Sequence, residues 1–413
     1  MIVPSLLRRR RPRAAAALAT ALALGAPLGA QPSAPPPDPV AELRAEIAQL
    51  RAEYAAQLAA LEARLAALEA APPGPEAPSA PPAPAPAALA QTSSYFNPAI
   101  SLIGNFFAVA GDNENESRPI AELSEVELGF QAVIDPYAKG DIFVAFGEEG
   151  AEVEEGYVTF TALPAQFLAR VGRVLATFGK TNSQHMHYLP WADKPLPLVS
   201  LLGGEEGWRG DGLSVSRIFP IGETFSELTV EAFRGDAEGL FEAADRNDLA
   251  YNSHLKLFRD LSEAANLELG LSWGTGPNGS TPDARTDLAG LDLTWRWKPL
   301  RTAHYRGFTL RGELLQSDRE TPDGDQRALG WFASAEARLA RRWWAFGRLE
   351  SSERADDASL RDEGFALGLT FDPSEFSRLR AEYRQRRYAE DVTADELLMQ
   401  LQFILGAHGA HPF

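Results

Sequence analysis

The chain has 413 residues, no cysteine and a formal net charge of −18, with 57 Asp and Glu residues against 39 Lys and Arg. The lack of cysteine excludes a disulfide scaffold, a thiolate zinc site and cysteine catalysis, and the acidic balance argues against a nucleic-acid-binding surface. Hydrophobic residues make up 45% of the chain, but the mean hydropathy is −0.21 and no long apolar run follows the N-terminal segment, which excludes a bundle of membrane-spanning helices.

Residues 1–30 have the pattern of a secretory signal peptide. Arginines crowd positions 8–13, a short apolar segment covers residues 14–28, and Ala30 precedes the expected cleavage site. The apolar segment is too short for a membrane anchor. We therefore expect an exported protein.

A spacer, a helix and a linker are expected next. Residues 31–39 are Pro-rich, and residues 71–91 form a Pro/Ala linker, which is typical of an extended spacer. Between them, residues 40–70 place apolar side chains at alternating three- and four-residue steps, with one stutter after Tyr54. This narrow seam predicts a coiled coil that mediates self-association, and the alternative is a solvated amphipathic helix lying on the main domain.

From about residue 92 to residue 413 the hydrophobic period changes to two, which is the period of β-strands. In residues 291–298, for example, Leu291 and Leu293 alternate with Asp292 and Thr294, and residues 397–405 follow the same rule. In a soluble sandwich the apolar face packs a core, whereas in a transmembrane barrel it meets lipid.

The lengths of the connections favour the barrel. Long polar segments alternate with tight turns, as in bacterial barrels. Eight long segments and seven tight turns predict sixteen antiparallel strands. The expected long connections are residues 111–121, 148–155, 180–210, 234–247, 274–286, 317–326, 351–363 and 388–395; the expected turns are residues 135–140, 163–166, 219–224, 259–264, 299–304, 340–342 and 372–377.

The chain ends in Phe413, and a C-terminal aromatic residue after an alternating strand resembles the signal by which outer-membrane barrels are recognised for assembly. With the signal peptide, coiled coil and Pro-rich linker, the chain resembles bacterial outer-membrane porins, nearest to the phosphate-selective porin O and P group. The resemblance implies a trimeric, passive, water-filled channel in the outer membrane of a Gram-negative-type bacterium, in contact with lipid and the barrel-assembly machinery, with its stalk in the periplasm. That group has lysine-rich pore walls, whereas this chain has five lysines, so phosphate specificity is not expected.

If the apolar side chains face lipid, the opposite parity lines the pore. Charged side chains on that parity would set the ion preference, although the alternative is that they neutralise neighbours across strands. Arg348 is the least clear member, because Phe346 shares its parity, and residues 378–386 form the densest cluster. The candidates are Glu125, Glu127, Arg296, Arg311, Arg338, Arg348, Arg378, Arg380, Arg384 and Arg386.

The longest connection, residues 180–210, is the third on its side and is rich in aromatic residues, proline and glycine, which suits a packed loop. In porins of this general type the third loop makes the constriction, so Glu205 and Glu206 are candidates for its acidic side. His185 and His187, with Asp193 nearby, are candidate ligands of a divalent metal, and no other cofactor is expected.

No nucleophile elbow, metalloprotease motif or phosphate loop is present, and the adjacent Ser253 and His254 would face opposite sides of a strand, so an enzyme is not expected. The sequence predicts a porin-type channel for small hydrophilic solutes or ions. The alternative is a structural, tethering or metal-related barrel without an open general pore.

Overall fold

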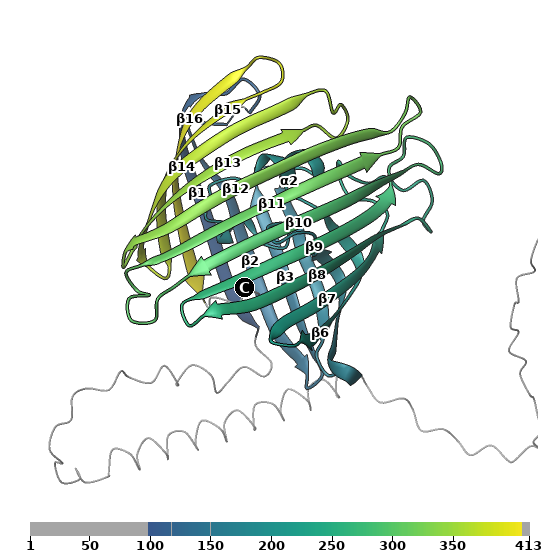
Figure 1. The fold of residues 1–413 in the computed structure, drawn as a ribbon, viewed down its shortest axis with the longest axis horizontal. Helices are drawn as coiled ribbons and strands as arrows, with labels where there is room; N and C mark the ends of the chain where they lie inside the picture. The colour runs from purple at the N-terminus through teal and green to yellow at the C-terminus, as the bar shows by residue number, and fades with distance from the viewer. Residues whose placement is uncertain (1–97, 117, 149, 407–413) are drawn as a thin grey trace, which may run out of the picture. The chain divides into compact units, whose positions relative to one another are not determined.

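The computed structural model describes residues 98–116, 118–148 and 150–406. The predicted signal peptide, spacer, coiled coil and linker, and the terminal Phe413, lie outside these residues. The described residues form one closed barrel of sixteen antiparallel strands (Figure 1). The all-β, sixteen-stranded barrel predicted from hydrophobic period and loop lengths is confirmed.

The strands follow one another around the wall in chain order, and β1 pairs with β16 to close it. Within the described ranges, no helix is long and apolar enough to cross a membrane. The strands are β1 (Ala99–Asp112), β2 (Ala121–Asp135), β3 (Ala138–Gly147), β4 (Gly150–Phe160), β5 (Phe167–Leu175), β6 (Arg209–Ile221), β7 (Thr224–Arg234), β8 (Leu249–Ser262), β9 (Ala265–Pro277), β10 (Arg285–Trp297), β11 (Gly307–Arg319), β12 (Gln326–Ala340), β13 (Trp343–Glu353), β14 (Arg361–Ser374), β15 (Ser377–Arg387) and β16 (Thr393–Gly406); the short helices are η1 (Pro164–Gln166), η2 (Met186–Tyr188) and α2 (Leu196–Leu201).

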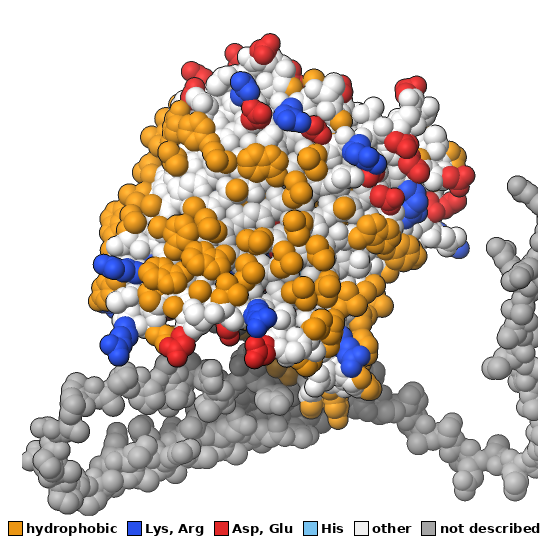
Figure 2. All heavy atoms as spheres, in the orientation of Figure 1, with side chains coloured by type: hydrophobic (Ala, Val, Ile, Leu, Met, Phe, Trp, Pro, Cys, Tyr) orange, Lys and Arg blue, Asp and Glu red, His pale blue; other side chains and the backbone are white. Residues whose placement is uncertain are grey.

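The wall is inverted relative to a soluble protein, because its apolar side chains point outward and its polar side chains point inward. On β16, Leu397, Met399 and Leu401 are 40–50% exposed, whereas Glu396 and Gln400 are 3% and 5% exposed. A soluble sandwich would bury the first set and expose the second. Figure 2 shows apolar side chains spread over the middle of the wall, with charged side chains toward its two ends, which is the surface that a lipid bilayer requires.

Two predicted connections are wrong. The expected tight turn at residues 299–304 is a longer connection, residues 298–306, between β10 and β11. Residues 148–155 are not a long loop, because Gly147 pairs with Gly150 and the chain returns at once as β4. The acidic run that suggested a loop is therefore part of the wall. Gly150 has a φ of 126°, which residues with a side chain rarely adopt, so the tight turn depends on this glycine.

Candidate functional site

The connection between β5 and β6, residues 176–208, is folded into the barrel and is called here the inward loop. Its apolar side chains pack against inward-facing side chains of the wall, and Phe178, Trp191, Leu198 and Trp208 are at most 1% exposed. The wall makes room with small residues: a Cβ atom added at Gly274 would lie 2.7 Å from Trp208 Cζ3. Short helix α2, visible behind β11 and β12 in Figure 1, belongs to this loop.

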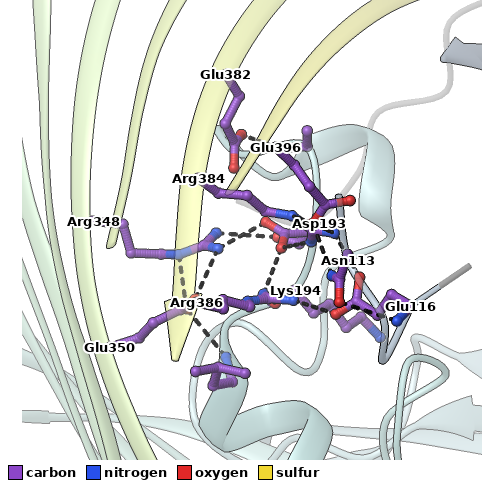
Figure 3. A network of polar contacts seen from close by, with 12 residues as sticks. Asn113, Glu116, Asp193, Lys194, Arg348, Glu350, Glu382, Arg384, Arg386 and Glu396 are labelled. Carbon is purple, nitrogen blue, oxygen red and sulfur yellow. Dashed lines mark hydrogen bonds and ion pairs between the residues drawn. The ribbon is translucent and has the colours of Figure 1, made fainter. Parts of the chain in front are cut away.

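Asp193 anchors the inward loop to the wall through three buried arginines (Figure 3). Its Oδ1 atom lies 2.7 Å from Arg348 Nη2, and its Oδ2 atom lies 2.7 Å from Arg384 Nη1 and 2.5 Å from Arg386 Nη2. Burial acts to raise the pKa of Asp193, but the three guanidinium groups outweigh it and hold this pKa well below its ordinary value. Asp193 is therefore ionised and is the centre of a buried charge network.

The same network reaches a second loop, between β1 and β2. The Glu116 carboxylate lies 2.5 Å from Arg384 Nη2 and 2.7 Å from Arg386 Nη1. On the wall, Glu350 pairs with Arg348 and Arg386. Buried charges are tolerated only when they are paired and hydrogen-bonded, so these contacts tie both loops and strands β13 and β15 into one unit.

Further hydrogen bonds hold the inward loop near its base. Glu313 on β11 accepts hydrogen bonds from the Thr181 backbone N–H at 2.7 Å and from the Thr181 hydroxyl at 2.5 Å. The Asn182 side chain donates to the carbonyls of Ala176 and Trp208, both at 2.8 Å, and closes the base of the loop. Through these contacts a wall carboxylate, Glu313, and a loop amide, Asn182, satisfy loop backbone groups that water would otherwise bind.

The predicted arginines fall into two groups in the structure. Arg348, Arg380, Arg384 and Arg386 lie on the inner side of the wall but are at most 2% exposed, because the inward loop covers them. Arg380 donates to the backbone carbonyls of Trp191 and Leu189 at 2.5 and 2.8 Å. Phe346 shares the inward parity of Arg348 because it packs against apolar side chains of the loop. These four arginines hold the loop in place.

All of the remaining predicted residues except Glu127, which is buried, line cavities inside the barrel. Arg296 and Arg311 line a cavity of about 1130 Å³ toward the end of the barrel with the β2–β3 and β8–β9 turns, which we call the mixed cavity. Glu125, Glu205 and Glu206 line a cavity of about 670 Å³ at the end that carries the β3–β4 turn, which we call the acidic cavity. Arg338 and Arg378 line a third cavity of about 410 Å³.

The two larger cavities have opposite charge. The acidic cavity is lined by seven acidic side chains against three cationic side chains, Arg118, Lys194 and Arg209. Burial raises the pKa of two of the seven, Glu205 and Glu206, above the ordinary value. The mixed cavity has more cationic than acidic side chains, and one of the former, Lys180, pairs with Glu268. Burial lowers the pKa of Lys180 to about 8, although Glu268 acts to raise it. The seven acidic side chains are Glu122, Glu125, Glu148, Glu152, Glu154, Glu205 and Glu206.

Leu175, Gln184 and His185 line both larger cavities and therefore lie between them, and we call these three residues the constriction. His185 is held by the wall: its Nδ1 atom lies 3.2 Å from Glu127 Oε2 and 3.2 Å from Glu154 Oε2, and its Nε2 atom lies 2.9 Å from Glu155 Oε2. Burial acts to lower the pKa of His185, but these carboxylates outweigh it and raise this pKa well above its ordinary value.

A β-bulge allows two consecutive glutamates to reach the same histidine. Phe143 pairs with Glu155 and Val144 pairs with Val153, so Glu154 is the extra residue of β4. In a regular strand, consecutive side chains point to opposite faces, and a bulge re-aims one of them.

The predicted metal ligands are only partly brought together. His185 and His187 are neighbours, with ring centroids 5.6 Å apart, and His187 Nδ1 lies 3.2 Å from Glu127 Oε2. Asp193 does not join them, because the arginines bind it. Glu154 and Glu155 were missed because their acidic run suggested a loop; the alternation of Ala151 and Val153 with Glu152 and Glu154 was the available signal.

Comparison with known proteins agrees with this architecture. No protein-family model matches the chain. An uncharacterized protein of Aquifex aeolicus (strain VF5) is 29% identical over 340 residues, which cover 72% of this chain and 71% of that protein. Similar solved structures include an anion-selective porin from Comamonas acidovorans, with a TM-score of 0.52 and 14% identity over 75% of this chain and 100% of that chain.

Two further solved structures have the same fold. OmpF of Salmonella typhi, in complex with daunomycin, has a TM-score of 0.51 and 8% identity, and covers 74% of this chain and 97% of its own. A loop-deletion mutant of OmpT, an outer membrane protein of Vibrio cholerae, has a TM-score of 0.51 and 11% identity, and covers 75% of this chain and 99% of its own. With the lipid-compatible wall, these likenesses define the fold as that of an outer-membrane porin.

Proposed function

We propose that this protein is a passive outer-membrane channel for small hydrophilic solutes and ions. Its path would run through the acidic cavity, past the constriction at Leu175, Gln184 and His185, and into the mixed cavity. The observation that carries the proposal is that two cavities inside one closed wall, both lined by charged side chains, share these three lining residues. The inward loop, anchored on the opposite wall by Asp193, would narrow the lumen to this path.

We further propose that the channel prefers cations. The excess of carboxylates in the acidic cavity creates a negative potential where a solute would enter, and a pore selects on local wall charge. Three of the covered arginines, Arg348, Arg384 and Arg386, would contribute little to this potential, because their charges are balanced by Asp193, Glu116 and Glu350 within the same network. The channel would have no catalytic role.

Planar-bilayer recordings of the purified protein test the proposal. We expect a stable open current whose reversal potential in a KCl gradient indicates cation preference. Glu152→Gln with Glu206→Gln should reduce that preference, because both side chains line the acidic cavity and are about half exposed. Glu223→Gln, on the turn between β6 and β7, is the matched control and should leave it unchanged. A silent bilayer with a folded barrel would favour the structural alternative.

The remaining features belong to the same proposal. The N-terminal signal would export the chain, the coiled coil of residues 40–70 would form a trimer on the periplasmic side, and Phe413 would be read by the barrel-assembly machinery. The end of the barrel that carries the β2–β3 and β8–β9 turns would then face the periplasm, as the short turns do in bacterial barrels. The combination of a predicted stalk and a barrel supports a relationship with the phosphate-selective porin O and P group. Chemical cross-linking of the full chain and of a variant without residues 40–70 tests the trimer.

A further inference from the structure

The constriction contains a compact set of metal-ligand atoms from three elements. His185 and His187 come from the inward loop, Glu127 from β2 and Glu154 from β4, and one ligand atom each of Glu127, Glu154 and His185 lies within 4.8 Å of the others. Glu127, His185 and His187 are 2%, 8% and 3% exposed. We propose that these side chains bind a divalent transition-metal ion of the zinc type, with His187 as the fourth ligand.

The spacing of the ligand atoms fits a tetrahedral ion. Two ligand atoms bound to zinc at about 2.0–2.1 Å and at the tetrahedral angle lie about 3.3–3.4 Å apart. His185 Nδ1 lies 3.2 Å from an oxygen of Glu127 and 3.2 Å from an oxygen of Glu154, and His187 Nδ1 lies 3.2 Å from the same Glu127 oxygen. Glu127, Glu154 and His185 thus form a compact set of three ligands, and His187, which lies outside that set, would have to shift toward the ion to complete the coordination sphere.

Glu155 supplies the support that metal-binding histidines require. A ligating imidazole usually donates its other ring N–H to a carboxylate, which fixes the tautomer and the direction of the ligating nitrogen. His185 Nε2 lies 2.9 Å from Glu155 Oε2, and Glu155 Oε1 accepts the Leu175 backbone N–H at 2.9 Å. Nδ1 is thereby directed at Glu127 and Glu154. The bulge at Glu154 gives one strand both the ligand and the supporting carboxylate.

The charge balance also favours a divalent cation. Three carboxylates meet two imidazoles, so the cluster remains negative even when His185 carries a proton. Within the described part of the chain, Glu127 Oε1 is buried without a hydrogen-bond donor, and a buried carboxylate oxygen without a partner is costly. A metal ion bound to Glu127 would compensate this oxygen. Imidazole with carboxylate ligands suits zinc, copper or nickel better than calcium or magnesium.

Metal binding can be measured without reference to transport. The full-length protein, stripped with a chelator in detergent, is dialysed against micromolar Zn²⁺ and the bound metal is counted by mass spectrometry, with the visible spectrum of Co²⁺ reporting the geometry. We expect one metal per chain and a tetrahedral cobalt spectrum. His185→Gln should abolish binding, and Glu155→Gln should weaken it by about 10–100-fold.

His254→Gln is the matched control, because His254 is a buried inward-facing histidine on β8 whose Nδ1 lies 2.8 Å from Ser272 Oγ. It should retain full binding, and heat-dependent gel mobility verifies that each variant folds. Absence of stoichiometric metal from the wild type would overturn the site. Binding by a folded His185→Gln variant that equals wild-type binding would overturn it as well.

Because the ligands lie at the constriction, a bound ion should also reduce the current, and this consequence rests on the proposed channel. Micromolar Zn²⁺ should lower the conductance of the wild type but not that of His185→Gln. Binding without any change of an existing current would overturn the blocking role. Binding to a protein that carries no current would support the metal site and contradict the channel.

Discussion

Asparagine in place of Asp193 should release the inward loop from the wall. Asp193 is 1% exposed and pairs with three arginines whose side chains are at most 3% exposed. Removing one member of a buried ion network leaves uncompensated charge and costs about 3–5 kcal/mol. At about 1.4 kcal/mol for each factor of ten, the ratio of seated to released loop should fall by roughly two to four orders of magnitude.

The barrel itself should survive this change, because its wall is closed by strand pairing that does not involve Asp193. The expected result is therefore local: new protease cleavage within residues 176–208, and a larger and noisier single-channel conductance as the loop leaves the lumen. Limited proteolysis followed by mass spectrometry, and planar-bilayer recording, measure the two effects.

Asp211→Asn provides the matched control. Asp211 pairs with Arg173 at 2.7 Å, but both side chains are more than one third exposed, so loss of this pair should cost about 0–1 kcal/mol. If Asp193→Asn keeps both the protease resistance and the conductance of the wild type, the arginine network does not hold the loop and the reasoning is refuted.

Three further predictions follow from the same geometry. The three arginines hold the pKa of Asp193 in the folded protein well below its unfolded value, so the stability that Asp193 contributes is present above the unfolded pKa and is lost only as pH falls through the folded pKa. Protection of the inward loop against proteolysis should therefore be the same at pH 7 and pH 5. New cleavage at pH 5 would contradict this prediction. Burial lowers the pKa of Lys180 to about 8, so raising the pH from 7 to 9 should remove the Lys180 charge and shift the reversal potential toward cation preference. Lys180→Met should abolish this shift. An equal shift in the variant would mean that another group causes it. Gly274→Val should displace Trp208, because the added Cβ would lie 2.7 Å from its ring, at a cost of about 1–3 kcal/mol. Tryptophan fluorescence measures the displacement, and Gly140→Val on β3, where an added Cβ would meet only Ile134 at 3.4 Å, is the control. An unchanged Gly274→Val spectrum would contradict the prediction.

The sequence predicts the barrel well because the period of two acts at every strand. Outward Leu397 and Met399 and inward Glu396 and Gln400 follow directly from alternation, since each side chain is placed by its own backbone. Loop lengths then predict the strand count. The error at residues 148–155 arose because Glu152 and Glu154 face the lumen, where an acidic run on a strand has the composition of a loop.

The candidate site was less predictable, because periodicity shows which face of the wall a side chain lies on but not which loop covers that side chain. Arg384 and Arg386 do face inward, but the inward loop covers them and Asp193 neutralises them, which depends on contacts across about 190 residues of chain. The pairing of Glu154 and Glu155 with His185 depends on a bulge that alternation cannot indicate. In contrast, the packed aromatic residues of the loop follow from its composition, as Trp191 and Trp208 illustrate.

Solutes should pass the constriction between the acidic and mixed cavities, and cysteine accessibility tests this passage directly. The chain has no cysteine, so one can be introduced alone. Gln184→Cys places a thiol where both cavities meet, and Leu198→Cys places one in the packed side of the inward loop. A charged, membrane-impermeant thiol reagent should reduce the current of Gln184→Cys in steps and leave Leu198→Cys unchanged. An open current that the reagent does not alter in Gln184→Cys would contradict the account.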